Sequence, residues 1–213
     1  MIPDLGFIHK FIPSPQESPV TLLLLHGTGG SEDDMIPIAQ DMLPDASILS
    51  PRGKILEGGM PRFFKRLAEG VFDLNDLEFR TNELANFVKD ASQEYKFGLK
   101  GLVAIGFSNG ANIAASMLFL RPECIAGGVL FRPMVPLRPK KIPDLSSKSV
   151  LISSGQFDTL VPHAQVEELR DMLKKAGANV EVHWNAANHG LTDREVQTAG
   201  AWLRNLAESY KQR

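Results

Sequence analysis

The sequence predicts an α/β fold in which a mostly parallel sheet is covered by helices on both faces. Along the chain, apolar runs typical of strands alternate with segments whose apolar residues recur at helical spacing. Strands that alternate with helices build parallel sheets with both faces covered. The 213 residues show no internal repeat, low-complexity tract or linker, so residues 1–213 are expected to form one domain.

Seven strands are expected in this sheet. The first is an antiparallel leading strand around residues 6–12, and the others cover residues 20–25, 47–50, 102–105, 127–130, 150–153 and 180–184. In a mostly parallel sheet the loops that follow the strands gather at one edge, and the functional site is expected there.

Long helices are expected between and after these strands. One runs from about residue 75 to residue 95, with its apolar residues on one stripe. Another follows Pro162 and stops at Gly177. The last begins at Thr192, where Glu195 three positions later completes a capping box.

Composition and charge exclude several classes of protein. The formal net charge of −2 gives no reason to expect nucleic-acid binding. No apolar run approaches the roughly 20 residues of a membrane span, and the first residues do not resemble a signal peptide, so a cytoplasmic location is expected. The single Cys124 excludes an internal disulfide. Neither a metal nor a cofactor is expected, and a homodimer is left open.

The most informative motif is GFSNG at residues 106–110, which follows an apolar strand and opens a helix. This is the G-x-S-x-G pattern of a nucleophile elbow, in which a sharp turn lifts a serine hydroxyl clear of the sheet. A Cβ at either glycine would crowd the neighbouring strand or helix. The free N–H groups of the helix start point at any negative charge that develops near Ser108. The alternative is an ordinary glycine-bounded turn between a strand and a helix.

A serine nucleophile needs a base and an acid that orients the base. Asp158 lies in the loop after the strand at 150–153, and His189 lies in the loop after the strand at 180–184. The order Ser108, Asp158, His189 is the chain order of α/β-hydrolases and differs from that of the other two common serine-triad folds. The sequence therefore predicts a catalytic triad of these three residues.

Residues 21–30 read as a buried strand that breaks into a glycine-rich loop, with Ser31 as an expected helix N-cap. A dinucleotide fingerprint fails here, because Glu32 occupies the position of its third glycine. His26 is expected to shape the turn. The loop is expected instead to supply the backbone N–H of Thr28 to an oxyanion hole, with the N–H of Asn109 as the second donor.

The chain resembles the phospholipase/carboxylesterase family of the α/β-hydrolase superfamily, in the bacterial carboxylesterase branch related to acyl-protein thioesterases. The matching pieces are LHGTG at 25–29, PRG at 51–53, GFSNG at 106–110, GQFD at 155–158 with Val161-Pro162, and His189 with Leu191-Thr192. The resemblance implies an α/β-hydrolase fold with Ser108, Asp158 and His189 as the triad. Two positions depart from it: Asn188 stands where the family has glycine, and Asn109 stands where acyl-protein thioesterases carry glutamine, so their protein substrates do not carry over.

The substrate pocket is less well specified. Residues 131–148 contain four prolines and are too short and broken to build a cap domain. The segment Pro51–Phe72 is the other candidate wall: Phe63 and Phe64 are expected to line an acyl or aryl pocket, and Arg52 or Arg62 to bind a substrate carboxylate. The alternative for this segment is an amphipathic helical turn with a solvated basic face.

The sequence thus predicts a serine carboxylesterase that cleaves a small-molecule ester or thioester through an acyl-enzyme on Ser108. His189 is expected to act as the base, Asp158 to orient it, and Thr28 and Asn109 to hold the oxyanion. Two alternatives are a ligand receptor that keeps the hydrolase fold with little turnover, and a dienelactone-type hydrolase. Cysteine would be expected at the elbow of the latter, and Ser108 counts against it.

Overall fold

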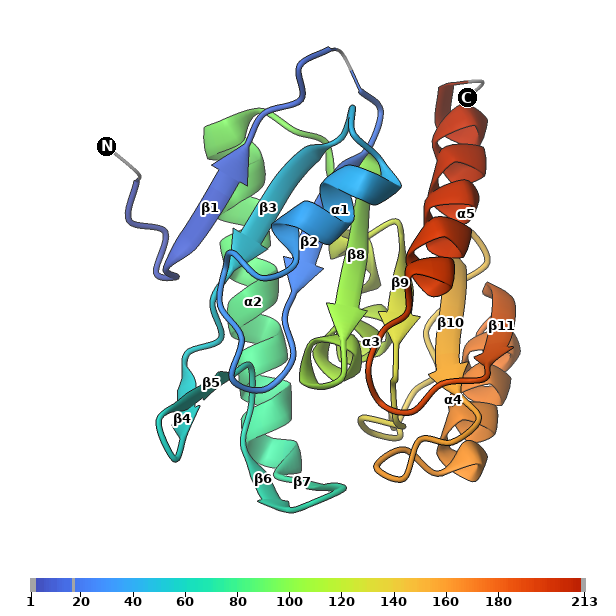
Figure 1. Ribbon diagram of the computed structural model, residues 1–213. Helices are drawn as coiled ribbons and strands as arrows, with labels where there is room; N and C mark the ends of the chain where they lie inside the picture. The colour runs from blue at the N-terminus through green and yellow to red at the C-terminus, as the bar shows by residue number, and fades with distance from the viewer. Residues whose placement is uncertain (1–2, 17, 212–213) are drawn as a thin grey trace.

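The computed structural model describes residues 3–16 and 18–211, and a seven-stranded sheet forms its centre (Figure 1). The strands are β1 (His9–Ile12), β2 (Thr21–Leu25), β3 (Ser47–Pro51), β8 (Leu102–Phe107), β9 (Gly127–Phe131), β10 (Ser149–Gly155) and β11 (Asn179–Asn185). Their spatial order is β1-β3-β2-β8-β9-β10-β11. β1 runs antiparallel to β3, and every other pair in this sheet is parallel. The expected strands and the antiparallel leader are confirmed, with bounds that differ by a few residues.

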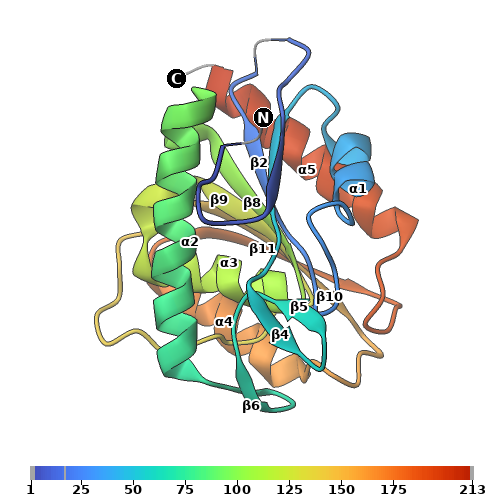
Figure 2. The same ribbon diagram turned by 90° about the vertical axis from the view of Figure 1, so that its left-hand side faces the viewer.

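Helices cover both faces of the sheet (Figures 1 and 2). On one face lie α2 (Leu74–Tyr95), α3 (Asn109–Leu120) and α4 (His163–Lys175), and on the other lie α1 (Ile36–Met42) and α5 (Asp193–Lys211). Two short 3-10 helices, Leu99–Gly101 and Pro122–Cys124, lie in the connections. Because side chains alternate along a strand, Leu23 and Leu25 of β2 pack in one apolar cluster and Leu22 and Leu24 in the other. The predicted α/β fold is confirmed.

Two helix starts follow their sequence signals. Asp73 caps α2 by accepting a hydrogen bond from the backbone N–H of Asp76 at 3.1 Å. At α5, the Thr192 N–H donates to the Glu195 carboxylate at 3.1 Å, and the Glu195 N–H donates to the Thr192 hydroxyl at 3.4 Å. The predicted capping box is therefore present.

The start of α1 differs from the prediction. Ser31 does not cap a helix; its hydroxyl donates to the Asp34 carboxylate at 2.7 Å and closes a turn. α1 begins only at Ile36, with Pro37 in its first turn. Proline is favoured there because it lacks the N–H that the first turn leaves unpaired, and this signal outweighed the serine.

The segment Pro51–Phe72 contains two β-hairpins, so the alternative of an amphipathic helical turn is wrong. β4 (Ile55–Glu57) pairs with β5 (Met60–Arg62), and β6 (Arg66–Ala68) pairs with β7 (Val71–Phe72). Gly58 and Gly59 join the first pair with φ values of 57° and 83°, which suit glycine far better than other residues. Both hairpins lie beside the carboxyl ends of the parallel strands (Figures 1 and 2). They therefore border the edge of the sheet where a site is expected.

Three further features bear on function. Residues 132–148, all within the described chain, form neither helix nor strand, in agreement with the predicted lack of a cap domain. Cys124 is buried in the larger apolar cluster, and burial raises the pKa of its thiol to about 11. Among residues 3–16 and 18–211, no helix has both the length and the apolar character needed to cross a membrane.

Candidate active site

Ser108 lies at the apex of a strained turn between β8 and α3. Its φ of 51° and ψ of −111° fall where a residue with a Cβ is disfavoured, at a typical cost of about 1–3 kcal/mol. Two contacts explain why the turn persists. A Cβ on Gly110 would lie 1.8 Å from the Leu25 carbonyl oxygen, so α3 packs against β2 as only glycine allows. The Ser108 N–H donates to the Phe131 carbonyl at 2.9 Å and ties the turn to β9.

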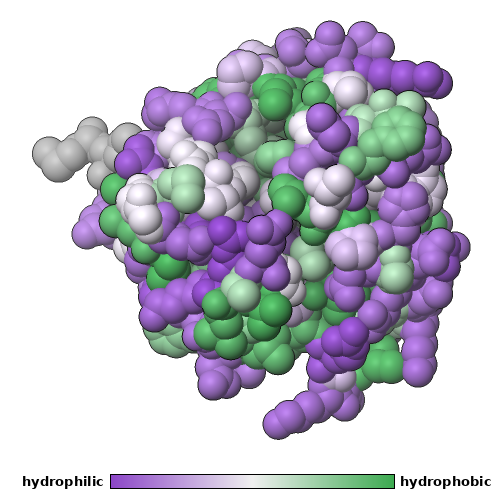
Figure 3. All heavy atoms as spheres, turned by 60° about the horizontal axis from the view of Figure 1, so that its bottom comes forward, coloured by the Kyte–Doolittle hydropathy of each residue, from purple (hydrophilic) through white to green (hydrophobic). Residues whose placement is uncertain are grey.

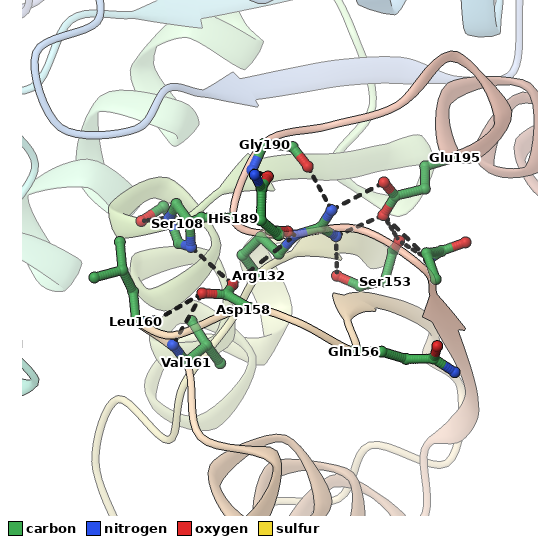
Figure 4. A network of polar contacts seen from close by, with 12 residues as sticks. Ser108, Arg132, Ser153, Gln156, Asp158, Leu160, Val161, His189, Gly190 and Glu195 are labelled. Atoms are coloured by element: carbon green, nitrogen blue, oxygen red, sulfur yellow. Dashed lines mark hydrogen bonds and ion pairs between the residues drawn. The ribbon is translucent and has the colours of Figure 1, made fainter.

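The structure brings Ser108, His189 and Asp158 together (Figure 4). His189 Nε2 lies 3.0 Å from Ser108 Oγ, and His189 Nδ1 lies 2.8 Å from Asp158 Oδ2. The other Asp158 oxygen accepts hydrogen bonds from the N–H groups of Leu160 and Val161 at 2.8 and 3.2 Å. Since an ionised carboxylate only accepts, Nδ1 carries the proton and Nε2 is free to accept the serine proton. This is the geometry that a nucleophile, a base and an orienting acid require.

The β4–β5 hairpin holds the residues predicted for the oxyanion hole. The Gly29 N–H donates to the Pro61 carbonyl at 2.9 Å. Arg62 Nη1 donates to the Thr28 hydroxyl at 2.6 Å. The Phe63 N–H donates to the Asn109 side-chain carbonyl at 2.7 Å. Three consecutive residues thus fix the glycine-rich loop and the start of α3 relative to each other, a role that sequence reasoning missed.

His26 completes this support. Its Nε2 accepts the Gly53 N–H at 2.9 Å, and its Nδ1 donates to the Gly27 carbonyl at 2.6 Å. Burial lowers the pKa of His26, which favours the neutral ring that these two bonds require. A Cβ on Gly53 would lie 2.4 Å from the Arg62 carbonyl, so only glycine lets these two backbone segments approach this closely. His26 shapes the turn, as expected.

A cavity of about 70 Å³ opens beside Ser108, lined also by Thr28, Asn109 and His189. Its apolar wall is formed by Phe72, Met134, Leu160 and Val161, and its charged lining includes Arg62, Arg66 and Glu69. The face that comes forward in Figure 3, at the carboxyl ends of the strands, correspondingly mixes hydrophobic and hydrophilic side chains. This lining offers contacts to both the apolar and the polar parts of a small substrate.

The structure corrects three of the four pocket residues expected from the sequence. Phe63 and Phe64 are 2% and 0% exposed and lie in the core, so the apolar wall comes from Phe72 instead. Arg52 pairs with Glu32 through two hydrogen bonds of 2.5 and 2.8 Å, away from the cavity lining. Of these four residues only Arg62 lines the cavity, and burial lowers the pKa of its guanidinium.

Sequence reasoning also missed Arg132, which follows β9 and is fully buried beside the Asp158–His189 pair (Figure 4). It forms an ion pair with Glu195, the same residue that completes the capping box of α5. Burial by itself would raise the pKa of Glu195, but hydrogen bonds from Arg132 and Ser153 outweigh it, and the pKa lies below its ordinary value. The one available signal was an arginine at the end of an apolar strand.

Comparisons with known proteins show the family to which the chain belongs. The model of the dienelactone hydrolase family matches residues 71–211. The putative hydrolase MhqD of Bacillus subtilis (strain 168) is 44% identical over 195 residues, which are 92% of this chain and 98% of that protein. The Bacillus cereus carboxylesterase superposes with a TM-score of 0.93 at 48% identity, covering 95% of each chain. A structure of YahD with malic acid superposes with a TM-score of 0.88 at 32% identity, covering 93% of this chain and 98% of that one.

Proposed function

Because the chain belongs to the dienelactone hydrolase family, we propose that it cleaves small carboxylic esters or thioesters through an acyl-enzyme on Ser108. It is an ester hydrolase with the α/β-hydrolase fold. One observation carries the proposal: the series of hydrogen bonds from Asp158 through His189 to Ser108, at 2.8 and 3.0 Å. Ser108 stands where a dienelactone-type enzyme would be expected to carry cysteine, which favours a serine esterase within this family.

The proposed reaction follows from the direction of these hydrogen bonds. His189 Nε2 takes the proton of Ser108 Oγ as the oxygen attacks the ester carbonyl, and Asp158 stabilises the imidazolium that forms. The backbone N–H groups of Thr28 and Asn109 hold the negative oxygen of the tetrahedral intermediate. The imidazolium then gives its proton to the leaving group. Water, activated by His189 in the same way, releases the acyl group from Ser108.

A panel of p-nitrophenyl esters of graded acyl length, combined with a fluorophosphonate label and mass spectrometry, tests this proposal. Wild-type protein should turn over short esters and carry the label on Ser108. Ser108→Ala should remove the label and lower kcat by on the order of a million-fold, as for triads elsewhere. Cys124→Ala is the control and should keep full activity. A wild-type protein that binds esters without turnover or labelling would favour the receptor instead.

The charged lining of the cavity supports a preference for esters that carry a second carboxylate. Arg62 has five N–H donors but, among the described residues, only three acceptors: the Phe64 carbonyl, the Thr28 hydroxyl and Glu57. Arg66 shares Glu57 with it. Spare donors in a partly enclosed cavity suit a planar carboxylate. The malic acid in YahD, a small dicarboxylate, is consistent with this preference.

Hemiesters of dicarboxylic acids, compared with neutral esters of equal size, test the preference. Arg62→Met should lower kcat/KM for the hemiester by about 10- to 150-fold beyond the loss that it causes on the neutral ester, because a hydrogen bond to a charged group contributes about 1.5–3 kcal/mol. Arg52→Met is the matched control, since Arg52 pairs with Glu32 outside the cavity lining. Equal rates on both substrates, before and after the change, would contradict the preference.

Two broader expectations belong to the same proposal. The cytoplasm is the proposed location, and immunoblots of fractionated cells test it. A homodimer remains an alternative to a monomer, and light scattering after size exclusion distinguishes the two. Neither affects the proposed chemistry, because Ser108, Asp158 and His189 all come from one chain.

A further inference from the structure

Arg132 is a buried cation immediately behind the proposed triad. It follows β9 directly, its side chain is 0% exposed, and its φ of 56° places it in the left-handed region. Residues other than glycine rarely adopt that conformation, so the surrounding contacts must hold it there. A buried arginine also needs acceptors for all of its donors. The acceptors that it finds indicate its role.

All five N–H donors of Arg132 meet acceptors (Figure 4). Two reach the carboxylate of Glu195, at 2.5 and 2.9 Å, and one reaches the Ser153 carbonyl at 3.2 Å. The other two reach the carbonyls of Asn188 and Gly190, at 3.0 and 2.6 Å. Asn188 and Gly190 are the residues on either side of His189. The guanidinium therefore binds the backbone on both sides of His189.

The charge of Arg132 also faces the acid of the triad. Its Nε lies 4.0 Å from Asp158 Oδ2, the oxygen that accepts the hydrogen bond from His189 Nδ1. Glu195 balances the cation and is itself satisfied by Ser153 Oγ at 2.6 Å and by Asn185 and Thr192. The cation thus lies between two carboxylates, one structural and one in the triad. The guanidinium therefore lies beside the triad carboxylate without a direct hydrogen bond to it.

We propose that Arg132, with Glu195 as its counter-ion, is a positioning residue for the base of this hydrolase. It fixes the backbone on both sides of His189 and holds its own charge beside Asp158, so that Nδ1 and Nε2 face their partners. This inference rests on the proposed function, since it requires His189 to be the base. This positioning requires the five N–H donors of a planar guanidinium, which the ammonium group of lysine cannot supply.

If Arg132 and Glu195 formed a merely structural ion pair, their loss would change stability alone, whereas the loss of a positioning residue also lowers kcat. A double variant separates these two roles. Arg132→Met alone leaves Glu195 buried and unpaired, which destabilises the fold. Arg132→Met/Glu195→Gln removes both charges while glutamine keeps the capping box, so its melting temperature should lie above that of Arg132→Met alone. The hydrogen bonds from Arg132 to the carbonyls of Asn188 and Gly190 remain absent in this variant. In the double variant kcat should therefore remain lower by about 10²-fold with KM for a neutral ester unchanged, because small misplacements of a catalytic group cost this much.

Three readouts complete the experiment. Arg132→Lys should also lower kcat, since lysine restores the charge and not the fork. The proton resonance of His189 Nδ1–H should shift or broaden in the double variant, which a change in stability alone would not cause. Arg138→Met/Glu168→Gln is the matched control, because this surface Arg–Glu pair is also joined by two hydrogen bonds, at 2.7 and 2.9 Å. It should leave kcat and the resonance unchanged.

Wild-type kcat in a stable double variant would overturn the role assigned to Arg132. That outcome is distinct from a failure of the proposed function, which would appear as normal turnover in Ser108→Ala. Labelling of Ser108 by fluorophosphonate in each variant links the two experiments. A slower labelling rate in the double variant, with complete labelling at long times, would support the positioning role, and an unchanged rate would count against it.

Discussion

The site has an oxyanion side, around Thr28 and Asn109, and a base side, around His189 and Asp158. Each side contains a buried arginine, and the two arginines have different contacts. On the oxyanion side, Arg62 contacts Thr28 and shares Glu57 with Arg66, with donors to spare beside the cavity. On the base side, Arg132 has every donor occupied by protein acceptors. A guanidinium with spare donors in a cavity can recognise a ligand, whereas a saturated one can only position groups of the protein itself.

The two halves also differ in what holds them in place. The oxyanion side depends on backbone hydrogen bonds and on glycines at close approaches, such as Gly53 and Gly110. The base side depends on buried charge, in Arg132, Glu195 and Asp158. Activity should therefore be sensitive to added side-chain volume on the oxyanion side and to the loss of charge on the base side. The predictions below exploit this contrast.

The largest effect should come from the base side. Asp158→Asn should keep the fold and lower kcat by about 10⁴-fold, because asparagine does not hold the Nδ1 proton and the imidazole loses its correct tautomer. Steady-state kinetics on a short p-nitrophenyl ester measure this. Asp144→Asn and Asp193→Asn are controls on the surface and in the first turn of α5. A greater loss in either control would move the acid away from Asp158.

A smaller loss is expected from adding volume on the oxyanion side. Gly53→Ala places a Cβ 2.4 Å from the Arg62 carbonyl and must push the β4–β5 hairpin away from Thr28. If this displaces one oxyanion donor, kcat should fall by about 10²- to 10³-fold. Gly98→Ala is the matched control, because its Cβ would meet nothing within 4 Å and its φ is −89°. Equal kinetics for the two variants would show that the hairpin does not set the oxyanion hole.

Removing charge on the oxyanion side should matter less. Arg62→Met deletes the hydrogen bond to Thr28 Oγ1, but the bond from Gly29 to Pro61 remains. We expect a loss of about 10-fold in kcat on neutral esters, corresponding to one ordinary hydrogen bond. This is less than the loss expected when Arg132 and Glu195 are both replaced. Rate measurements on the two variants side by side test the contrast, and the reverse order would refute it.

The last prediction concerns the pH dependence of stability rather than activity. Because the pKa of Glu195 is lowered on folding, its contribution to stability is present above the unfolded value near 4.3 and is lost as pH falls through the lower folded value. Glu195→Gln lacks this contribution. Its urea midpoint should therefore be lower at pH 7 and fall less steeply than that of the wild type below about pH 5. Parallel curves for the two proteins would contradict the lowered pKa.

Much of the fold follows from local patterns in the sequence. The strands and the long helices are marked by apolar periodicity and caps, and GFSNG at residues 106–110 indicates the elbow because its glycines face close backbone contacts. The hairpins were missed although Gly58-Gly59 is a strong turn signal, because strands of three residues or fewer carry too little pattern to recognise.

The side chains around the site were harder to predict, because tertiary packing decides them. Phe63, Phe64 and Phe72 lie in one segment with nothing local to separate them, yet the first two enter the core and the third lines the cavity. Arg132 finds its counter-ion at Glu195, which is 63 positions away along the chain. Spacing does not reveal such a pair, and an arginine before Pro133 reads as an exposed loop residue.

The buried Cys124 has a consequence for chemical durability. It is the only thiol in the chain, and its pKa of about 11 keeps it protonated and unreactive at neutral pH. The proposed nucleophile is an oxygen, which oxidants and soft electrophiles attack far less readily than a thiolate. The enzyme should therefore retain its activity after treatment with iodoacetamide at levels that inactivate cysteine hydrolases, without any reductant to protect it.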